Sequence, residues 1–423
     1  MTTLLLIFCI VFAAFVTYCI VIKRPYLRIP LVIALVVRTG FMLAGLFVLS
    51  LPDSTADARS FQRVAMLRSN LGIDELLSDL SFNSYFYSDV VAIFYSLIHP
   101  DVVVMHGLNL LAGIGIVYSV GVLAHELWGK RSAYKAAMVA ALFPTLVLYS
   151  AVTMREAMLT LCLLLSCIMF IRWYQSRALY QALLAMVFSF LAMYFHGAHA
   201  INLGWLLVCM LVITARTVKG KARYRHYMRS FGMFAVAMAL LMVIGTLAQN
   251  ISLPKLGSLE TTDAERLLSY SGKAMTDGAS YPGWLGVETI TDLSWKWSVR
   301  LPYFMFSPFP WDVRTARHLI GLADGLLYLG LFCMALRSRG VLRNNKLAVL
   351  AVLFVLPVVL VYSMFIGNFG TGLRHRSKFV PIFIAIAVGS YTVWKEGRRH
   401  GFRQLVFSTP SEKSVKAMED QMR

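Results

Sequence analysis

Long apolar runs separated by short basic stretches are the main pattern of this chain. Runs of about twenty apolar residues recur along the whole length, and each can cross a bilayer as a helix. The pattern predicts eleven spans, at residues 4–22, 29–51, 103–127, 136–153, 158–171, 179–195, 201–215, 231–248, 318–336, 347–366 and 379–394. The predicted fold is an all-α polytopic membrane protein, with a single transmembrane domain over 1–404 and a polar cytoplasmic tail over 405–423.

Two longer polar segments, at about 52–100 and 250–317, interrupt the apolar pattern and are predicted to be loops outside the membrane. Within the first, residues 56–70 carry apolar positions at helical spacing, namely Ala58, Phe61, Ala65 and Leu67. This spacing, with arginines between the apolar positions, predicts a helix lying along the membrane interface. The apolar run 90–98 is too short to cross a bilayer and indicates a re-entrant or interfacial segment.

The second polar segment ends in an aromatic stretch at residues 306–311. Pro308 and Pro310 exclude a continuous helix there, because proline lacks the N–H group and clashes with the preceding turn. The tryptophan and tyrosine side chains of this segment fit an aromatic belt at the membrane interface. For Trp311 the sharper alternative is stacking against a sugar ring.

Lysine and arginine gather at every second junction between the predicted spans. Because cytoplasmic loops carry an excess of these residues, the basic junctions are predicted to be cytoplasmic; they contain Lys23, Arg24, Lys130, Arg131, Arg172, Arg177, Arg216, Arg337, Lys346 and Lys395. The alternation predicts an outer N-terminus and a cytoplasmic C-terminus. It places both long polar segments, residues 155–156, residues 196–199 and residues 370–378 together on the outer face.

Composition narrows the class of protein without changing this picture. Of the 423 residues 58% are hydrophobic and 14% charged, and the mean hydropathy of +0.68 excludes an ordinary soluble domain. The net charge of +19 would suit nucleic acid, but the cations cluster in short loops, so we expect no nucleic-acid partner. The six cysteines lie mostly inside apolar runs and indicate neither a metal site nor a disulfide framework. Residues 1–22 lack a basic start and a clear cleavage site, which favours a first span over a signal peptide.

The stretch 370–378 departs from the charge rule, because it is basic although it is predicted to face outward. After two glycines at the mouth of a span come Arg374, His375, Arg376 and Lys378. Charge at that depth is unfavourable unless it faces a cavity, a partner or an anion, and arginine can grip a phosphate with two parallel hydrogen bonds. On an extended loop alternate residues project the same way, so Arg374 and Arg376 are predicted to reach one phosphate. The alternative is a positive flank that sets topology or snorkels to lipid headgroups.

Acidic residues on the same outer face are the candidates for acid–base chemistry. Asp53 and Asp57 follow an outward span, where a carboxylate can be a general base, a metal ligand or a solvated loop charge. Glu156 follows Arg155 at an outer turn. These two can form an ion pair that caps a helical hairpin, or Glu156 can orient a base or bind a hydroxyl.

Three further polar residues stand out from their surroundings. His196 and His199 lie one turn apart if helical; two histidines without a third ligand do not predict a metal site, and polar loop residues are the simpler interpretation. Arg38 lies a third of the way along its span and must face protein, water or a headgroup phosphate. We interpret Arg38 as structural.

Four pieces of sequence then follow one another in a recognisable order: Asp57-Ala58-x-x-Phe61-x-x-x-Ala65, His106-Gly107-Leu108-Asn109-Leu110-Leu111, Glu126-Leu127-Trp128-Gly129-Lys130-Arg131-Ser132-Ala133, and the helix from Phe143-Pro144 to Glu156. Together with an arginine-rich outer loop before the last span, this order resembles the GT-C superfamily of polyprenyl-phosphate-dependent membrane glycosyltransferases. The resemblance covers residues 50–175 by pattern and the rest by architecture.

In that superfamily an aspartate of the first outer loop is the catalytic base, and outer arginines hold the lipid phosphate. The resemblance therefore implies Asp57 as the base, Asp53 as the second candidate, and Arg374 and Arg376 as phosphate clamps. Three features depart from the superfamily pattern: an extra span before the usual first one, no large soluble C-terminal domain, and residues 155–156 where a lone acid is more common. These departures leave donor and acceptor open, and they also fit the related bacterial polysaccharide polymerases.

The expected function is enzymatic: transfer of a sugar or oligosaccharide from a polyprenyl-(di)phosphate donor to a glycan or lipid-linked acceptor, at the outer face of the bacterial inner membrane, inverting with an aspartate base. A divalent cation is optional, because side chains alone can hold a phosphate leaving group. The catalytic candidates are Asp57, Asp53 and Glu156. The substrate-binding candidates are Arg374, Arg376, Lys378, Arg155, His196, His199 and Trp311.

Two other classes of function are weighed against glycosyl transfer. A transporter or flippase of a lipid-linked or anionic substrate would place ionisable residues near mid-membrane and show matched broken helices. Here the polar residues collect at one face, with Arg38 as the exception. A purely structural assembly protein would need no convergence of acid, arginine and aromatic groups.

Overall fold

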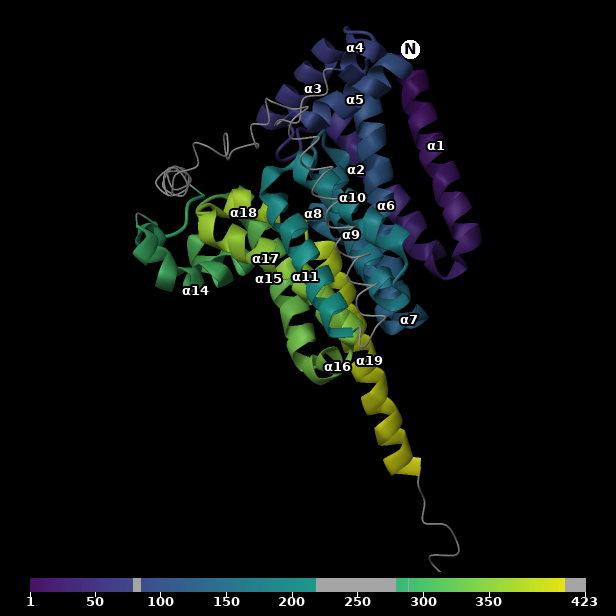
Figure 1. The fold of residues 1–423 in the computed structure, drawn as a ribbon. Helices are drawn as coiled ribbons and strands as arrows, with labels where there is room; N and C mark the ends of the chain where they lie inside the picture. Colours follow the sequence, from purple (N-terminus) through teal and green to yellow (C-terminus); the bar gives the residue numbers. More distant parts are fainter. Residues whose placement is uncertain (79–84, 218–278, 288, 408–423) are drawn as a thin grey trace, which may run out of the picture.

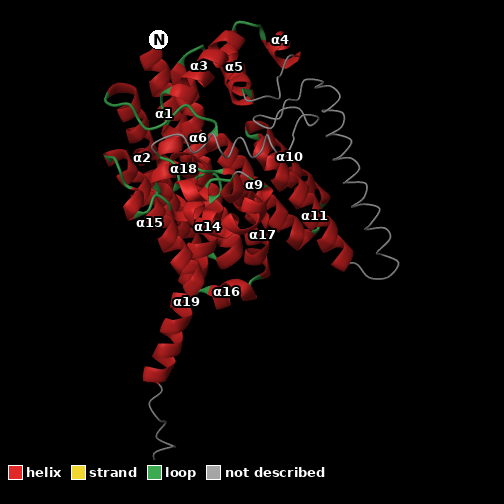
Figure 2. Ribbon diagram, turned by 90° about the vertical axis from the view of Figure 1, so that its left-hand side faces the viewer, coloured by secondary structure: helices red, strands yellow, loops and turns green. Residues whose placement is uncertain are grey.

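The computed structural model describes residues 1–78, 85–217, 279–287 and 289–407, and every regular element in this part of the chain is a helix (Figures 1 and 2). In chain order these helices are α1 (Thr2–Lys23), η1 (Pro25–Leu27), α2 (Arg28–Phe47), α3 (Ala56–Ser69), α4 (Ile73–Ser78), α5 (Phe86–Leu97), α6 (Val102–Trp128), α7 (Lys130–Leu142), α8 (Pro144–Ala151), α9 (Glu156–Ser176), α10 (Leu179–Phe195), η2 (Gly197–His199), α11 (Ala200–Thr217), η4 (Gly283–Leu285), α14 (Ile290–Phe306), η5 (Pro310–Asp312), α15 (Ala316–Arg337), α16 (Arg339–Asn344), α17 (Lys346–Phe365), α18 (Phe369–Arg376) and α19 (Val380–Phe407).

Helix α6 is the centre of the N-terminal part of the bundle. It packs against α1, α2, α7, α8, α9 and α19, and most of its length is buried. Two glycines allow this close packing, because a Cβ at Gly113 would lie 2.4 Å from Ser150 and a Cβ at Gly121 would lie 2.8 Å from Leu27. Small residues drive such contacts in a bilayer, where apolar side chains gain little by leaving lipid.

The C-terminal part of the bundle consists of α14, α15, α17 and α18, and α19 joins it to the N-terminal part. Helix α19 packs against α6 and α7 on one side and against α15 and α17 on the other. Helix α11 lies along α17, and α10 lies along α9 (Figure 1). The helices α3, α4 and α5 lie at the same end of the molecule as the N-terminus (Figure 1).

The chain is confirmed as an all-α protein with many helices suited to a membrane. Within the described residues, seven helices are long and apolar enough to cross a bilayer, and up to nine spans result if each of two bent helix pairs counts as one. The bent pairs are α7 with α8, at 58°, and α18 with α19, at 67°. The predicted span 179–195 is the 17-residue helix α10, and the predicted span 231–248 lies outside the described residues.

Arg38 explains how the break between α7 and α8 is tolerated. Pro144 has no N–H, so the carbonyl of Ala140 loses its helical partner. The guanidinium of Arg38 is fully buried and donates from Nη1 to Ala141 O at 2.8 Å and from Nη2 to Ala140 O at 3.1 Å. These contacts agree with the structural interpretation of Arg38.

The helix predicted at residues 56–70 is confirmed, and its place along the membrane interface stays a prediction. Helix α3 spans Ala56–Ser69, with Ala58, Phe61 and Ala65 buried, whereas Leu67 is exposed. The apolar run 90–98 forms the greater part of α5, and Ser88 Oγ donates to Phe61 O to join the two helices.

Later predictions have mixed outcomes. The prolines at 308 and 310 stop the helix as predicted, since α14 ends at Phe306 and η5 starts at Pro310. Helix α19 runs to Phe407, and the boundary at 404 between the transmembrane domain and the tail stays a prediction. Residues 250–278 of the second polar segment and 408–423 of the tail lie outside the described residues.

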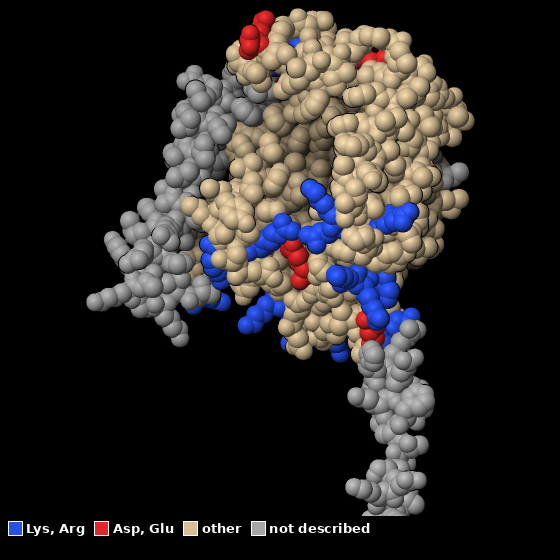
Figure 3. Space-filling model, turned by 90° about the vertical axis from the view of Figure 1, so that its right-hand side faces the viewer, with Lys and Arg blue, Asp and Glu red and all other residues tan. Residues whose placement is uncertain are grey.

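Lysine and arginine residues at helix ends gather at one end of the molecule, where α1 ends and α7 and α17 begin. We call this the basic end, and the opposite end, with the N-terminus of α1 and the start of α3, the site end. Figure 3 shows lysine and arginine in a band across the basic end, next to a broad surface with almost no charge. The band forms because successive basic junctions in the sequence come together; members include Lys23, Lys130, Arg131, Arg337, Arg343 and Lys346.

Candidate functional site

The basic stretch 370–378 is mostly helical, so the prediction of an extended loop is wrong. Asn368 caps α18, because its Oδ1 accepts from the backbone N–H groups of Gly370, at 2.8 Å, and Thr371, at 3.2 Å. Side chains two residues apart on a helix point to nearly opposite sides. Arg374 and Arg376 therefore diverge instead of converging on one phosphate.

Arg374 joins two carboxylates that lie far away in the sequence. Its Nη1 donates to Asp57 Oδ2 at 2.5 Å, and its Nε donates to Glu156 Oε1 at 2.6 Å. The Asp57 side chain is 59% exposed, that of Arg374 is 18% exposed and that of Glu156 is 1% exposed. The three residues thus form a line from the surface into the protein, and the Nη2 amino group of Arg374 is not used by either carboxylate.

Local structure positions both acids. Asp57 lies in the first turn of α3 and Glu156 is the first residue of α9, and a carboxylate is stabilised at a helix N-terminus. The non-helical connection between α8 and α9 is held by α6. Asn109 Nδ2 donates to Val152 O at 2.6 Å and to Met154 O at 2.8 Å. His106 Nδ1 lies 2.8 Å from Ala151 O at the same break. Residues of the stretch 106–111 therefore fix the backbone that precedes Glu156.

Arg376 faces the interior, which corrects its prediction as a second phosphate clamp. Its guanidinium is fully buried and Nη1 donates to Met305 O at 2.8 Å. Nη2 lies 3.5 Å from Asp324 Oδ2, and the guanidinium carbon lies 5.0 Å from the centre of the Tyr328 ring. These contacts join α18 to α14 and α15.

A buried group of basic and aromatic side chains lies behind Arg374. Lys378 Nζ donates to His375 Nδ1 at 2.9 Å and lies 5.5 Å from the centre of the Tyr362 ring. The Tyr362 hydroxyl lies 2.9 Å from His199 Nε2. The His196 ring is 5.1 Å from the His375 ring. Lys378, His196 and His199 thus lie together in the interior behind Arg374, and their role in substrate binding stays a prediction.

Charge in this buried group is concentrated around Glu156. Arg374, Lys378 and Arg155 all lie near enough to interact with its carboxylate. Burial lowers the pKa of Arg155 and the nearby Glu156 opposes that shift. Burial, and then the charge of Lys378, lowers the pKa of His196 well below its usual value, so His196 is neutral at neutral pH.

Arg155 and Asp53 flank the Asp57–Arg374–Glu156 line. The guanidinium of Arg155 lies over the Phe61 ring, 5.5 Å from its centre, so it packs against α3. Asp53 accepts a hydrogen bond from the Tyr149 hydroxyl at 2.8 Å, in a backbone conformation with φ of 60°. Aspartate is among the residues that tolerate this left-handed conformation best.

Trp311 lies apart from the Asp57–Arg374–Glu156 line. It lies on η5, 71% exposed, and its ring stacks on Phe309 at 4.9 Å. The Phe309 ring contacts the Tyr303 ring, which contacts the Tyr281 ring. Tyr281 lies next to α18, because a Cβ at Gly372 would lie 3.5 Å from the Tyr281 hydroxyl. Trp311 therefore remains an exposed aromatic at the rim of this region.

Three residues of the site were not chosen from the sequence: Tyr149, Tyr362 and His375. His375 could have been found, since it stands between the two arginines of the basic stretch. Tyr149 and Tyr362 lie within apolar runs, where a tyrosine is unremarkable, and only helix packing brings them to the charged residues.

The residues offer little for a metal ion. Both site carboxylates face Arg374, and among the described residues no group of three or more histidine, cysteine, aspartate or glutamate side chains is placed to hold a metal. Comparison of the chain with models of known protein families, with curated proteins and with solved structures finds no match in any of the three.

Proposed function

We propose that this protein is a membrane glycosyltransferase of the GT-C kind, which moves a sugar or oligosaccharide from a polyprenyl-(di)phosphate donor to a glycan or lipid-linked acceptor. The observation that carries this proposal is the pairing of Arg374 with both Asp57 and Glu156, from three distant parts of the chain. An exposed carboxylate beside a guanidinium with an unused amino group supplies both groups that the reaction requires.

Asp57 acts as the general base. Its side chain is more than half exposed, so it can reach the hydroxyl of an acceptor, while Arg374 fixes its Oδ2 atom. The acceptor oxygen attacks the anomeric carbon from the face opposite the phosphate and its proton passes to Asp57. The bond from the anomeric carbon to the phosphate oxygen breaks, its electron pair stays on the phosphate, and the configuration is inverted.

Arg374 stabilises the leaving phosphate, and Glu156 positions Arg374. Glu156 is fully buried and accepts from Nε, Asp57 accepts from Nη1, and Nη2 is left to donate to the phosphate of the sugar donor. Preorganised charge of this kind is the largest contribution in many enzymes, because it needs no reorganisation during the reaction. Glu156 is therefore assigned a positioning role instead of the acid–base role that the sequence suggested.

A transporter of a lipid-linked substrate is the alternative, and its main support in the sequence was Arg38. Both terminal amino groups of Arg38 donate to backbone carbonyls at the break after α7. Arg38 thus has a structural role that calls for no transported anion. Asp324 is a further ionisable residue inside a candidate span, where it pairs with Arg376 and so joins α15 to α18. The charged residues assigned to the reaction, Asp57, Glu156 and Arg374, lie at the site end.

The test uses the full chain reconstituted in liposomes with synthetic polyprenyl-phosphate and polyprenyl-diphosphate sugars. Glycosyl transfer releases the polyprenyl carrier and joins the sugar to the acceptor, whereas a flippase moves the intact donor between leaflets. Carrier release that requires Asp57 supports the proposal. Translocation of intact donor without carrier release would overturn it.

We also propose that the site end faces outward from a bacterial inner membrane and the basic end faces the cytoplasm, by the charge rule. Thr371, at the start of α18, and Asn344, at the end of α16, are both exposed. In a cysteine-free background, Thr371→Cys should react with an impermeant maleimide in intact spheroplasts and Asn344→Cys should react only after lysis. Labelling of Asn344→Cys in intact spheroplasts would reverse the orientation.

A further inference from the structure

The buried face of α15 carries polar residues that the proposed reaction does not use. Buried residues recur on this face at helical spacing: Gly321, Asp324, Gly325 and Tyr328. A Cβ at Gly325 would lie 2.3 Å from Phe306 O, so the end of α14 packs directly against this face. Asp324 and Tyr328 therefore lie inside a candidate span but are buried between helices instead of facing lipid.

Other elements bring polar side chains to the same place. Arg376 of α18 has Nη2 3.5 Å from Asp324 Oδ2, and its guanidinium carbon lies 5.0 Å from the centre of the Tyr328 ring. Thr145, in the first turn of α8, lies near both Asp324 and Tyr328. Two more polar residues extend this set beyond Arg376, and we call the whole set the Asp324 cluster: Thr145, Tyr281, Ser307, Asp324, Tyr328 and Arg376.

The Asp324 cluster is buried, yet most of its polar atoms have no partner in the protein. Every member is at least nine-tenths buried. Among their side-chain atoms Arg376 Nη1 does form a hydrogen bond, to Met305 O. Within the part of the chain that the structure describes, no protein group forms a hydrogen bond with the others, which are Asp324 Oδ1 and Oδ2, Arg376 Nε and Nη2, Thr145 Oγ1, Ser307 Oγ, and the hydroxyls of Tyr281 and Tyr328.

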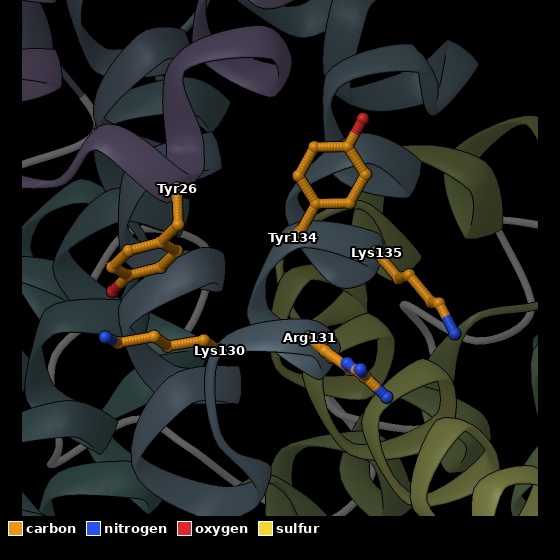
Figure 4. Close-up of a pocket in the computed structure, with 5 residues that line it drawn as sticks. All are labelled: Tyr26, Lys130, Arg131, Tyr134 and Lys135. Carbon is orange, nitrogen blue, oxygen red and sulfur yellow. The ribbon is translucent and has the colours of Figure 1, made fainter.

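Burial and convergence distinguish the Asp324 cluster from the exposed hollow at the basic end. That hollow is lined by Tyr26, Lys130, Arg131, Tyr134 and Lys135. Figure 4 shows the head group of Lys130 pointing to one side and those of Arg131 and Lys135 to the other. Exposed cations that diverge in this way are hydrated by bulk solvent and indicate no bound molecule. Polar groups buried within a span have to be satisfied inside the protein.

Water is the ligand that fits the chemistry of the Asp324 cluster. Arg376 and Asp324 have opposite charges, so the cluster has no net charge that would attract an ion. The guanidinium donates, the carboxylate accepts, and the hydroxyls do both. A water molecule donates and accepts at once, and a buried one typically makes about three hydrogen bonds to groups that are otherwise unpaired.

We propose that the Asp324 cluster binds ordered water molecules, which bridge Asp324, Arg376 and the neighbouring hydroxyls as a constant part of the contact between α8, α15 and α18. Hydration of both charges stabilises an ion pair that is not directly hydrogen-bonded inside a span. The water site and Arg374 lie on opposite sides of α18. The inference does not depend on the reaction proposed for the Asp57–Arg374–Glu156 line.

The experiment is radiolytic labelling of the purified full chain in detergent. A short X-ray pulse converts water into hydroxyl radicals, which oxidise the side chains next to it, and mass spectrometry of the peptides gives the rate at each residue. The matched control for Tyr328 is Tyr87, which is equally buried but donates its hydroxyl hydrogen bond to Asn109 Oδ1 at 3.1 Å. Tyr328 should be oxidised roughly tenfold faster than Tyr87, because bound water contacts its hydroxyl. Equal rates would overturn the proposal.

Two buried apolar residues distinguish bound water from transient opening of the bundle. Phe304 and Phe379 are as buried as Tyr328, and their rings contact each other. Both should be oxidised as slowly as Tyr87. If both are oxidised as fast as Tyr328, bulk water reaches the interior through opening of the bundle, and the assignment of a bound-water site is wrong.

The test variant is Asp324→Leu with Arg376→Met, which replaces both charges by apolar side chains. Oxidation of Tyr328 should then fall to the rate of Tyr87. The matched control is Asp89→Leu with Arg68→Met, which removes a buried pair that is directly hydrogen-bonded at 2.9 Å and should leave Tyr328 unchanged.

An unchanged rate at Tyr328 in the folded test variant would contradict the proposal. If the test variant does not fold, Thr145→Val is used, since it removes one hydroxyl while keeping nearly the same shape. Loss of this one partner of the water should slow oxidation of Tyr328 roughly threefold. The same rate as in the wild type would count against bound water equally.

Discussion

The two sides of α18 place arginine in opposite settings only two residues apart. Arg376 is fully buried, donates to Met305 O at the C-terminal end of α14 and lies beside Asp324. Arg374 is partly exposed and donates to two carboxylates. The same residue type therefore joins helices on one side and faces a potential ligand on the other.

The buried side follows a rule that two other arginines share. Arg38 donates to carbonyls in the last turn of α7, and Arg300 donates to Ser363 O and Ile366 O at the end of α17. The last carbonyls of a helix have no partner within it, and inside a membrane no water replaces that partner. An arginine that meets such carbonyls is structural, whereas one that meets carboxylates beside solvent is a candidate for chemistry.

The largest effect is expected on the structural side. Arg376→Met removes the partner of buried Asp324 and of Met305 O, and breaking a buried ion pair destabilises by about 3–5 kcal/mol. The unfolding temperature in detergent should fall markedly, while Arg339→Met on exposed α16 should leave it nearly unchanged. Donor affinity of the Arg376→Met protein that remains folded should equal that of the wild type. A selective loss of donor affinity would place Arg376 in the site instead.

Asp57→Asn should have the next largest effect. This effect is on the rate of transfer and not on stability. The substitution keeps the size of the side chain but removes its basicity, so transfer should slow by at least about a hundredfold, as general-base catalysis contributes. Asp53→Asn is the matched control, since Asp53 is held by the Tyr149 hydroxyl and does not bond Arg374. If Asp53→Asn is the slower variant, the base has been assigned to the wrong aspartate.

Arg374 should affect donor binding, and its removal should also lower stability, because the buried Glu156 carboxylate then has no hydrogen-bond partner among the described residues. A hydrogen bond to a charged group contributes about 1.5–3 kcal/mol, so Arg374→Ala should weaken donor affinity by roughly ten- to a hundredfold. Arg374→Lys keeps the charge but loses the fork geometry and should fall between wild type and Arg374→Ala. Donor titration of carrier release measures this. Unchanged affinity in both variants would assign the phosphate to another residue.

Glu156→Gln should give the smallest effect of the series on transfer, and it should also lower the unfolding temperature, because it removes a buried charge from among Arg374, Lys378 and Arg155. It leaves the side-chain volume but removes the charge that holds Arg374 Nε, so the guanidinium loses orientation while Asp57 still pairs with it. For a positioning role, KM for the donor should rise by about tenfold, corresponding to about 1.4 kcal/mol, with kcat within a few-fold of wild type. A fall in kcat to the level of Asp57→Asn would instead give Glu156 a direct part in proton transfer.

The sequence by itself determined the class of fold and the division of the chain into two ends. The length of an apolar run is a local property, because a helix in lipid must satisfy its own backbone hydrogen bonds. The charge of a short loop is local too, because it depends only on the residues of that loop. The same local signals predicted α3 from Ala58, Phe61 and Ala65, and the break at Pro308 and Pro310.

Only the tertiary structure decided which charged residues meet. Asp57 and Arg374 are separated by 317 positions and become neighbours only because α3 and α18 pack at the same end of the bundle. The opposite roles of Arg374 and Arg376 depend on α18 being a helix. The sequence pattern predicted an extended loop there, whereas the Asn368 side chain caps a helix. Direction of a side chain is set by backbone conformation and by the neighbours across the bundle, and a linear pattern of charges contains neither.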